Sequence, residues 1–324
     1  MAGRAGAGVR NERGLALVIV LLVLSLLLAI AGEFALAMRL EGTTTLNFRA
    51  AVAAGYLAEA AYQRALAELA PDAIAQHLDE TGLRVFRRSR NETVKAPDRR
   101  DIALGPGRFS YEITDEDARL NLNRMSPEQL HRLLTELGAE RDARDVIVDS
   151  TQDWRDANEE HRLNGAESDY YLSLPVPYRS KNADFDSVEE LLQVRGVTPQ
   201  FFYGTAEKPG LVAYLTVAGS GAININTASD LVLRTLGYVQ AQVDLLKQAR
   251  PYLDVNPNSL PPGVPRIGGL TFRSTSFRIE ATGEVPGQAR RTLRAIVRRQ
   301  TGQGGGARVM LRSWQWSQDE ERPS

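Results

Sequence analysis

The residues near the start of the chain form one apolar run, Leu15–Ala31, which contains a single polar residue, Ser25, and no charged side chain. Its length matches the shortest helices that cross the hydrocarbon layer of a membrane. The first acid after the run is Glu33, whereas basic residues dominate the segment before it: Arg4, Arg10 and Arg13. This asymmetry orients the N-terminus toward the cytoplasm. The pattern predicts one membrane-crossing helix over 15–36, with the rest of the chain on the other side.

The helical pattern does not stop at the end of that run. Residues 34–69 contain no proline, and Pro71 is the first residue that would end a helix. Apolar residues recur at helical spacing, at Leu46, Val52, Tyr56, Ala60, Leu66 and Leu69. The chain therefore predicts a single helix over 15–70, on the order of 80 Å long, apolar in its first half and amphipathic in its second.

Strand-like alternation appears in three segments that lie far apart in the chain: Phe109–Thr114, Phe277–Gly283 and Thr292–Arg298. Glu284–Gln288 has the composition of a turn between the last two. We expect an antiparallel sheet that packs on the long helix, built from 71–117 and 269–300. The intervening 118–268 would then be an inserted domain, which gives an α+β fold.

The inserted segment shows repeated helix start signals. They are Ser126–Gln129, Ser187–Glu190, Thr198–Pro199 and Thr227–Asp230, and Gly138 and Gly237 mark helix ends. We expect this domain to be mainly α-helical. The basic segment Arg84–Arg100 is expected to be a solvated loop, with a docking patch for an acidic partner as the alternative. Residues 301–324 are expected to form a flexible tail, in which Trp314 and Trp316 have no evident role.

Composition excludes several classes of chemistry. The chain has no cysteine, three scattered histidines and a net charge of -1. Disulfides, thiolate metal sites and a histidine-built zinc site are therefore not expected. The sequence contains no nucleophile-elbow, P-loop or dinucleotide-binding motif. These observations favour a protein that is not an enzyme.

The N-terminal run allows three interpretations. It is a secretory signal cut after Ala31, an uncleaved anchor, or the start of a mature protein released by a cut between Gly14 and Leu15. The continuation of the helical pattern to Leu69 favours the third, because a secretory signal needs no such continuation. Residues 1–14 would then be a leader.

The junction Arg13–Leu17 is similar to the leader junction of pseudopilins. Five further stretches, in matching order and spacing, resemble the minor pseudopilin K family of type II secretion systems: Thr114–Asn123, Asp153–Asp156, Gly165–Tyr171, Phe185–Leu192 and Ile223–Ala228. The resemblance implies a pilin-like fold and an inner-membrane protein with its head in the periplasm. It also implies processing by the prepilin peptidase and assembly with the minor pseudopilins I and J.

One position carries particular weight in that resemblance. Major pseudopilins have glutamate at the fifth mature position, which is Ile19 here. A buried carboxylate needs a cationic partner, and a subunit at the filament tip has no neighbour above it to neutralise. The family therefore implies a tip subunit that starts the filament and supports protein export, with Ile19, Phe34 and Tyr56 as candidate assembly residues.

The loop 153–169 is rich in carboxylates, the ligands that Ca²⁺ prefers, although its spacing is not that of an EF-hand. A solvated acidic surface is the simpler interpretation. The family resemblance implies a structural Ca²⁺ in this region, and the candidate ligands are Asp156, Glu160, Glu167 and Asp169.

The alternative function is an exported, membrane-anchored DNA-binding protein. Glu189–Val197 and Asn224–Ala228 both resemble helix-hairpin-helix segments, which bind phosphate through backbone amides. The basic residues near them are few: Arg195, Arg234 and Lys247. Because they form no clustered basic stripe, we expect no nucleic-acid partner.

Overall fold

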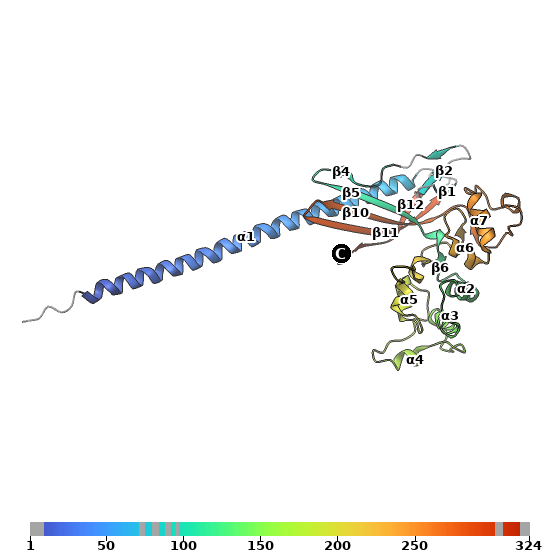
Figure 1. Ribbon diagram of the computed structural model, residues 1–324, viewed down its shortest axis with the longest axis horizontal. Helices are drawn as coiled ribbons and strands as arrows, with labels where there is room; N and C mark the ends of the chain where they lie inside the picture. Colours follow the sequence, from blue (N-terminus) through green and yellow to red (C-terminus); the bar gives the residue numbers. More distant parts are fainter. Residues whose placement is uncertain are drawn as a thin grey trace, which may run out of the picture.

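The computed structural model describes residues 10–70, 75–79, 84–87, 92–94, 97–301 and 307–317. Its first element is α1 (Arg10–Leu69), a single helix of 60 residues that projects from the head as a rod (Figure 1). The continuous helix expected over 15–70 is therefore confirmed, and it begins earlier, at Arg10. It is long and apolar enough to cross a membrane, and its most apolar window is 0% buried in the head.

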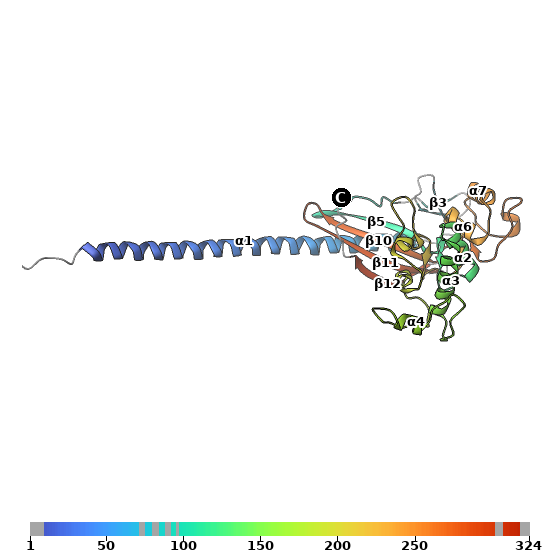
Figure 2. The same cartoon turned by 60° about the horizontal axis from the view of Figure 1, so that its bottom comes forward.

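The head is built on an antiparallel sheet in the order β12-β11-β10-β5-β4. Its central strands are β5 (Gly107–Asp115), β10 (Ser276–Val285) and β11 (Ala289–Thr301), which confirms all three expected strands and their pairing. The edges are β4 (Ile102–Leu104) and β12 (Ala307–Ser317). Figure 2 shows the strands crossing α1 at its C-terminal half.

Small residues let the sheet approach α1 closely. The helix turns a row of alanines toward the strands: Ala50, Ala54, Ala58, Ala61 and Ala65. At Gly283 of β10, a Cβ atom would lie 2.1 Å from the carbonyl oxygen of Ala54, so only glycine fits there. Phe277 and Ile279 precede Gly283 on the same face of β10 and are almost fully buried. This packing fixes the head at one end of α1.

The C-terminal segment differs from the expectation of a flexible tail. Residues Ala307–Ser317 form β12, which pairs with β11 from Ala307 to Ser317. Leu311, Trp314 and Trp316 lie opposite Val297, Ala295 and Leu293, the inward-facing residues of β11, and this pairing orders the segment. Trp314 and Trp316 therefore belong to a strand. Residues 302–306 and 318–324 lie outside the described part of the chain.

The basic segment is also not the simple loop that composition suggested. A small sheet forms from β1 (Ala75–Leu78), β2 (Arg84–Arg87) and β3 (Thr93–Val94). Arg99 is only 8% exposed, because its guanidinium donates to the Glu68 carboxylate at the end of α1. Tyr111 donates to the same carboxylate at 3.0 Å. Arg88, Arg90 and Lys95 lie outside the described residues.

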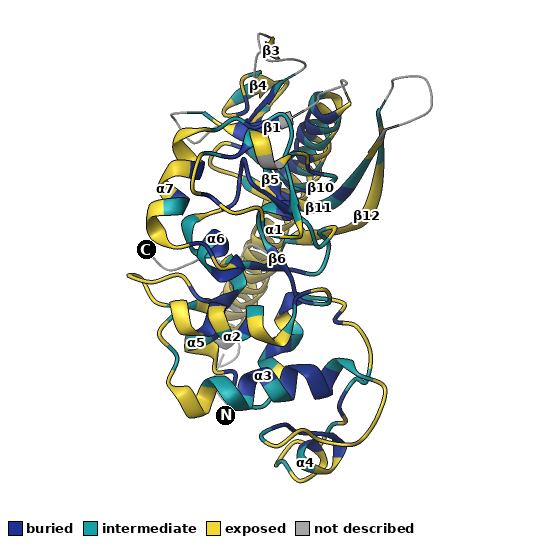
Figure 3. Cartoon of the chain, turned by 90° about the vertical axis from the view of Figure 1, so that its right-hand side faces the viewer, coloured by how far each residue is buried: buried dark blue, intermediate teal, exposed yellow. Residues whose placement is uncertain are grey.

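The middle of the chain has a second hydrophobic core, formed by buried residues between Leu120 and Val264 (Figure 3). Its helices are α2 (Pro127–Glu136), α3 (Arg141–Arg155), α4 (Ser168–Leu172), α5 (Pro199–Tyr203), α6 (Asp230–Leu236) and α7 (Gln240–Gln248). Short 3-10 turns are η1 (Glu116–Ala118), η2 (Val188–Gln193), η3 (Leu211–Ala213) and η4 (Pro257–Ser259). Two parallel bridges complete it, β6 (Leu120–Asn121) with β7 (Leu215–Thr216) and β8 (Ile223–Asn224) with β9 (Leu270–Thr271).

Most of the expected helix starts are confirmed. Ser126 caps α2 and forms a capping box with Gln129, while Gly237, at φ 113°, ends α6. Ser187 is the exception, because it opens the 3-10 turn η2 and no α-helix follows. The packing of Leu191 and Val194 into the second core ends that element after six residues.

Three buried acids join the two cores. Asp115 accepts hydrogen bonds from Asn224 Nδ2 at 3.1 Å and from Thr227 Oγ1 at 2.5 Å. Asp117 accepts from the backbone amides of Ser220 and Thr275, at 2.6 Å and 2.7 Å. Glu116 pairs with Arg278 of β10 at 2.8 Å. The acidic run at the end of β5 therefore fastens the inserted segment to the sheet.

Candidate functional site: the exposed helix and the acidic loop

The first candidate site is the part of α1 that extends beyond the head. Ile19, Phe34 and Tyr56 are 54%, 66% and 68% exposed. Large aliphatic side chains line the helix between Leu15 and Leu40, and none of them is covered. An apolar surface of this extent is stable only against lipid or other helices. Gly14 and Leu15, the expected cleavage site, lie within α1.

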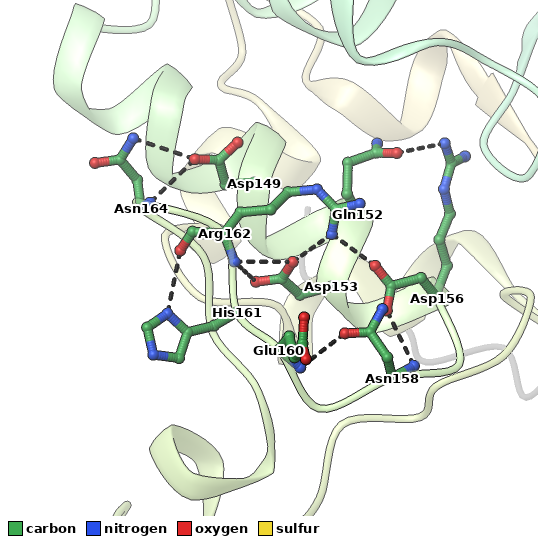
Figure 4. A network of polar contacts seen from close by, with 10 residues as sticks. Asp149, Gln152, Asp153, Asp156, Asn158, Glu160, His161, Arg162 and Asn164 are labelled. Carbon is green, nitrogen blue, oxygen red and sulfur yellow. Dashed lines mark hydrogen bonds and ion pairs between the residues drawn. The ribbon is translucent and has the colours of Figure 1, made fainter.

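The second candidate site is the loop that follows α3 (Figure 4). Asp153 lies in the last turn of α3 and is fully buried. The Arg162 guanidinium donates to Asp153 Oδ1 at 2.5 Å and to Asp156 Oδ2 at 2.6 Å, and the Arg162 amide donates to Asp153 Oδ2 at 3.1 Å. Arg162 therefore supplies the local positive charge between the two carboxylates.

Glu167 is the least compensated carboxylate of the loop. It is 1% exposed, and neither of its carboxylate oxygens has a hydrogen bond in the described part of the chain. Burial raises the pKa of Glu167 to about 7; the nearby Ser180 hydroxyl lowers this pKa, and the charges of Asp153, Asp156 and Glu159 raise it further. A buried carboxylate with such neighbours is unfavourable unless it is protonated or meets a cation.

The other two expected calcium ligands lie elsewhere. Glu160 and Asp169 are exposed, and Asp169 Oδ1 accepts from the amide of Tyr170 at 2.7 Å. Over the described ranges, no three or more Asp, Glu or His side chains are arranged as a metal site. The structure therefore brings Asp156 near Glu167 but leaves Glu160 and Asp169 outside that cluster.

Sequence reasoning missed three participants in this loop. Glu159 accepts from Ser168 Oγ and Asn182 Nδ2, both at 3.0 Å. Asp149 accepts from the Asn164 amide at 3.0 Å. Asp149 and Asp153 lie four residues apart on α3, so helical spacing indicated a shared face. The involvement of Arg162 depends on how the loop folds back, which spacing does not show.

The hairpin-like segments hold their basic residues internally. Arg195 donates to the Gly165 carbonyl at 3.0 Å and lies over the Tyr170 ring, 4.8 Å from its centroid. Arg234 pairs with Glu136, and Lys247 pairs with Asp230, each at 2.8 Å. These contacts pair each of the three side chains with groups of the inserted segment itself, so they form no clustered basic surface for phosphate.

Comparison with known proteins agrees with the sequence motifs. Residues 114–204 match the family model for type II secretion system (T2SS), protein K. The type II secretion system protein K of Pectobacterium carotovorum subsp. carotovorum is 29% identical over 53% of this chain. That of Klebsiella pneumoniae is 30% identical over 58% of it.

Over these stretches the chain is similar to the type II secretion system protein K family. The matched stretch spans about half of the Pectobacterium protein, 48%, and 59% of the Klebsiella protein. The fold also resembles a chain in the crystal structure of the GspK-GspI-GspJ complex from enterotoxigenic Escherichia coli. That likeness has a TM-score of 0.54 at 19% identity and covers 68% of this chain and 84% of the other. The α+β, pilin-like fold class is therefore confirmed.

Proposed function

We propose that this protein is a minor pseudopilin at the tip of the type II secretion pseudopilus, where it assembles with the minor pseudopilins I and J to start the filament. The observation that carries the proposal is the free half of α1. Its large apolar side chains are exposed beyond the head, and a helix of this kind requires other helices or lipid around it. Its role is structural, with no catalysis of its own, and supports protein export.

Three features support the tip position. The similar fold was crystallised as GspK with GspI and GspJ. Ile19 replaces the carboxylate that a shaft subunit would present to the amine of its neighbour. The inserted segment also adds a second core beside the pilin-like sheet (Figure 3), a bulk that suits an end of the filament better than its shaft.

Processing places the mature N-terminus at Leu15. The prepilin peptidase would cut after Gly14 and leave α1 anchored in the inner membrane with its head in the periplasm. N-terminal sequencing of the mature protein tests this step. Replacement of Gly14 by a bulky residue is expected to leave the precursor uncut. A mature protein that begins at Gly32 would instead establish a secretory signal.

Calcium is the proposed structural ion of the acidic loop. The observation that supports such an ion is Glu167, which is buried without a hydrogen-bond partner in the described part of the chain and has the carboxylates of Asp153, Asp156 and Glu159 near it. Arg162 already pairs with Asp153 and Asp156, so the ion would bind beside this guanidinium. Glu167 and Asp156 would hold it, supported by Asp153 and Glu159. Bound there, the ion would neutralise the cluster and hold the loop, which no disulfide can do.

Secretion itself gives the functional test. In a bacterium that lacks its own protein K but retains I and J of the same system, this chain is expected to restore export and pseudopilus formation. Duplex DNA provides the test of the alternative function, because phosphate binding must weaken steeply with added salt. Salt-dependent binding of duplex without any rescue of export would overturn the proposal.

A further inference from the structure

The two edges of the head sheet are built differently. One edge is β4, a strand of 3 residues that follows the positive-φ residue Asp101. The other edge is β12, a strand of 11 residues. Within the ranges that the structure describes, no strand pairs with its outer edge. Short edge strands discourage pairing with other chains, whereas long ones invite it.

The two halves of β12 also differ. Its first half carries Arg308 and Arg312, and the register shifts near Arg312, between Ile296 and Val297 of the partner strand. Charges and bulges of this kind protect an edge from pairing. The second half, Ser313–Ser317, has no charge and no irregularity, and it carries Trp314 and Trp316.

An apolar groove lies beneath this second half. Trp314 and Trp316 are paired across from Ala295 and Leu293, which face α1, so both rings point to the same side of the sheet. The Trp314 and Trp316 rings lie beyond the part of α1 that the sheet covers, and they remain 55% and 36% exposed. The groove has a volume of about 470 Å³, and aromatic and aliphatic side chains line it together with Glu59 and Gln63 of α1: Tyr56, Ala60, Tyr62, Leu293, Leu311 and Trp314.

Lipid is not a suitable occupant of this groove. Trp316 packs near Gly55 of α1, and the apolar run ends at Ala31. At 1.5 Å per residue, about 36 Å of helix separates the two points. The aromatic pair is therefore too far from the membrane to belong to its interfacial belt.

The groove continues an exposed stripe of α1. Phe48, Val52 and Tyr56 follow one another at intervals of four residues and are 68%, 41% and 68% exposed. Tyr56 also lines the groove. A subunit whose helix covers this stripe would therefore bring its head against the second half of β12.

We propose that Ser313–Ser317 of β12 accepts an extended strand from the head of a neighbouring pseudopilin in the tip complex. Backbone hydrogen bonds from the added strand would pair the amide and carbonyl groups on the outer edge of β12. Alternate side chains of that strand would point into the groove beside Trp314 and Tyr56. A helix in the groove would leave the β12 backbone unpaired, whereas a strand covers both features. This inference rests on the proposed function and specifies how the partner is recognised.

Hydrogen exchange on the full-length chain in detergent tests the pairing. The probes are full-length minor pseudopilins I and J, each added alone and then together. Alternate amides of Ser313–Ser317 already bond to β11, and the others point to the outer edge of β12. Strand addition predicts that the outward-pointing amides exchange rapidly in the free protein and slow at least ten-fold in the complex. Protection confined to α1 in the complex would overturn the inference.

Two matched variants sharpen the test. Trp314→Lys places a charge on the groove side of an exposed strand position and is expected to weaken partner binding at least ten-fold. Gln315→Lys adds the same charge to the next residue, on the opposite face, and is expected to change binding less than two-fold. Hydrogen exchange of β11 in each free variant verifies that the sheet is intact.

The outcomes separate the two proposals. If the wild-type chain binds neither I nor J, the proposed function fails. If it binds them and Trp314→Lys binds equally well, only the strand-addition inference is overturned. Protection of β12 by an exported protein, with none by I or J, would also overturn the inference as stated.

Discussion

The two halves of α1 use apolar residues in opposite ways. The half inside the head presents alanines, with Leu57 and Leu69 between them, and the sheet approaches closely enough to require Gly283. The half outside the head presents leucines, isoleucines and valines that no described part of the chain covers. The difference shows that one half is built for a fixed partner in the same chain and the other for partners that arrive during assembly.

The free half offers the largest expected effect. Ile19→Glu would place a carboxylate in an apolar environment, at a penalty of about 3 kcal/mol, or roughly 100-fold in an equilibrium constant. Export in the complemented strain is expected to fall accordingly, while thermal unfolding of the head is unchanged. Ile19→Leu is the matched control and should behave as wild type. Normal export by Ile19→Glu would remove the argument for a tip subunit.

Neighbouring residues on α1 compare the covered and uncovered surfaces directly. Leu57 is 4% exposed, and Leu57→Ala is expected to lower the free energy of unfolding by about 3 kcal/mol. Tyr56→Ala, at a position 68% exposed, should change it by less than about 0.5 kcal/mol. Denaturant unfolding of the full chain in detergent measures both. Equal losses of unfolding free energy in the two variants would contradict the assignment of Leu57 to the covered face of α1 and of Tyr56 to the exposed face.

The close contact between sheet and helix gives a third test. Gly283→Ala would place a Cβ atom 2.5 Å from the Ala58 amide nitrogen as well as against the Ala54 carbonyl. The sheet must then move away from α1, with an expected loss of about 2 kcal/mol in unfolding free energy. Gly268→Ala is the control, since no atom lies within 4 Å of its Cβ position. If Gly283→Ala leaves the unfolding free energy unchanged, the contact between the sheet and α1 is looser than described.

The acidic loop gives a test that depends on pH. Because the folded-state pKa of Glu167, about 7, lies above its ordinary value, the folded protein binds a proton more readily than the unfolded one. Without calcium, unfolding free energy should therefore fall by roughly 2.5 kcal/mol as pH rises from about 4.5 to 7. Glu167→Gln should remove this slope, and the exposed Glu160→Gln should retain it.

Added calcium gives a second test of Glu167. The ion should raise the melting temperature of the wild-type chain at pH 8 more than Mg²⁺ does, because Mg²⁺ demands tighter octahedral geometry. At one hundred times its dissociation constant the stabilisation is about 2.7 kcal/mol. Glu167→Gln should abolish most of this gain. A melting temperature that is indifferent to calcium and to chelator would establish a solvated acidic loop.

Local signals account for the parts of the fold that were predicted from sequence. The long helix, the three central strands and the capping box at Ser126 each depend on residues close together in the chain. The strand β12 was missed because its order comes from pairing with β11, and its two tryptophans do not alternate with charged residues. The burial of Arg99 depends on Glu68, which is 31 residues away.

The candidate site shows the same limit. Sequence reasoning selected Glu167, which proved to be the buried and uncompensated carboxylate, and also Asp156 near it. It could not separate these from Glu160 and Asp169, because exposure depends on how the loop folds back. Nor could it show that Arg162 reaches Asp153, since that contact requires the loop to return to the end of α3.

Association with the minor pseudopilins I and J tests the central claim most directly. The full-length chain, I and J, purified in the same detergent and mixed at about ten micromolar, should elute from a sizing column as one species that contains all three. The result that would contradict the account is elution of this chain by itself at that concentration, while I and J remain bound to each other.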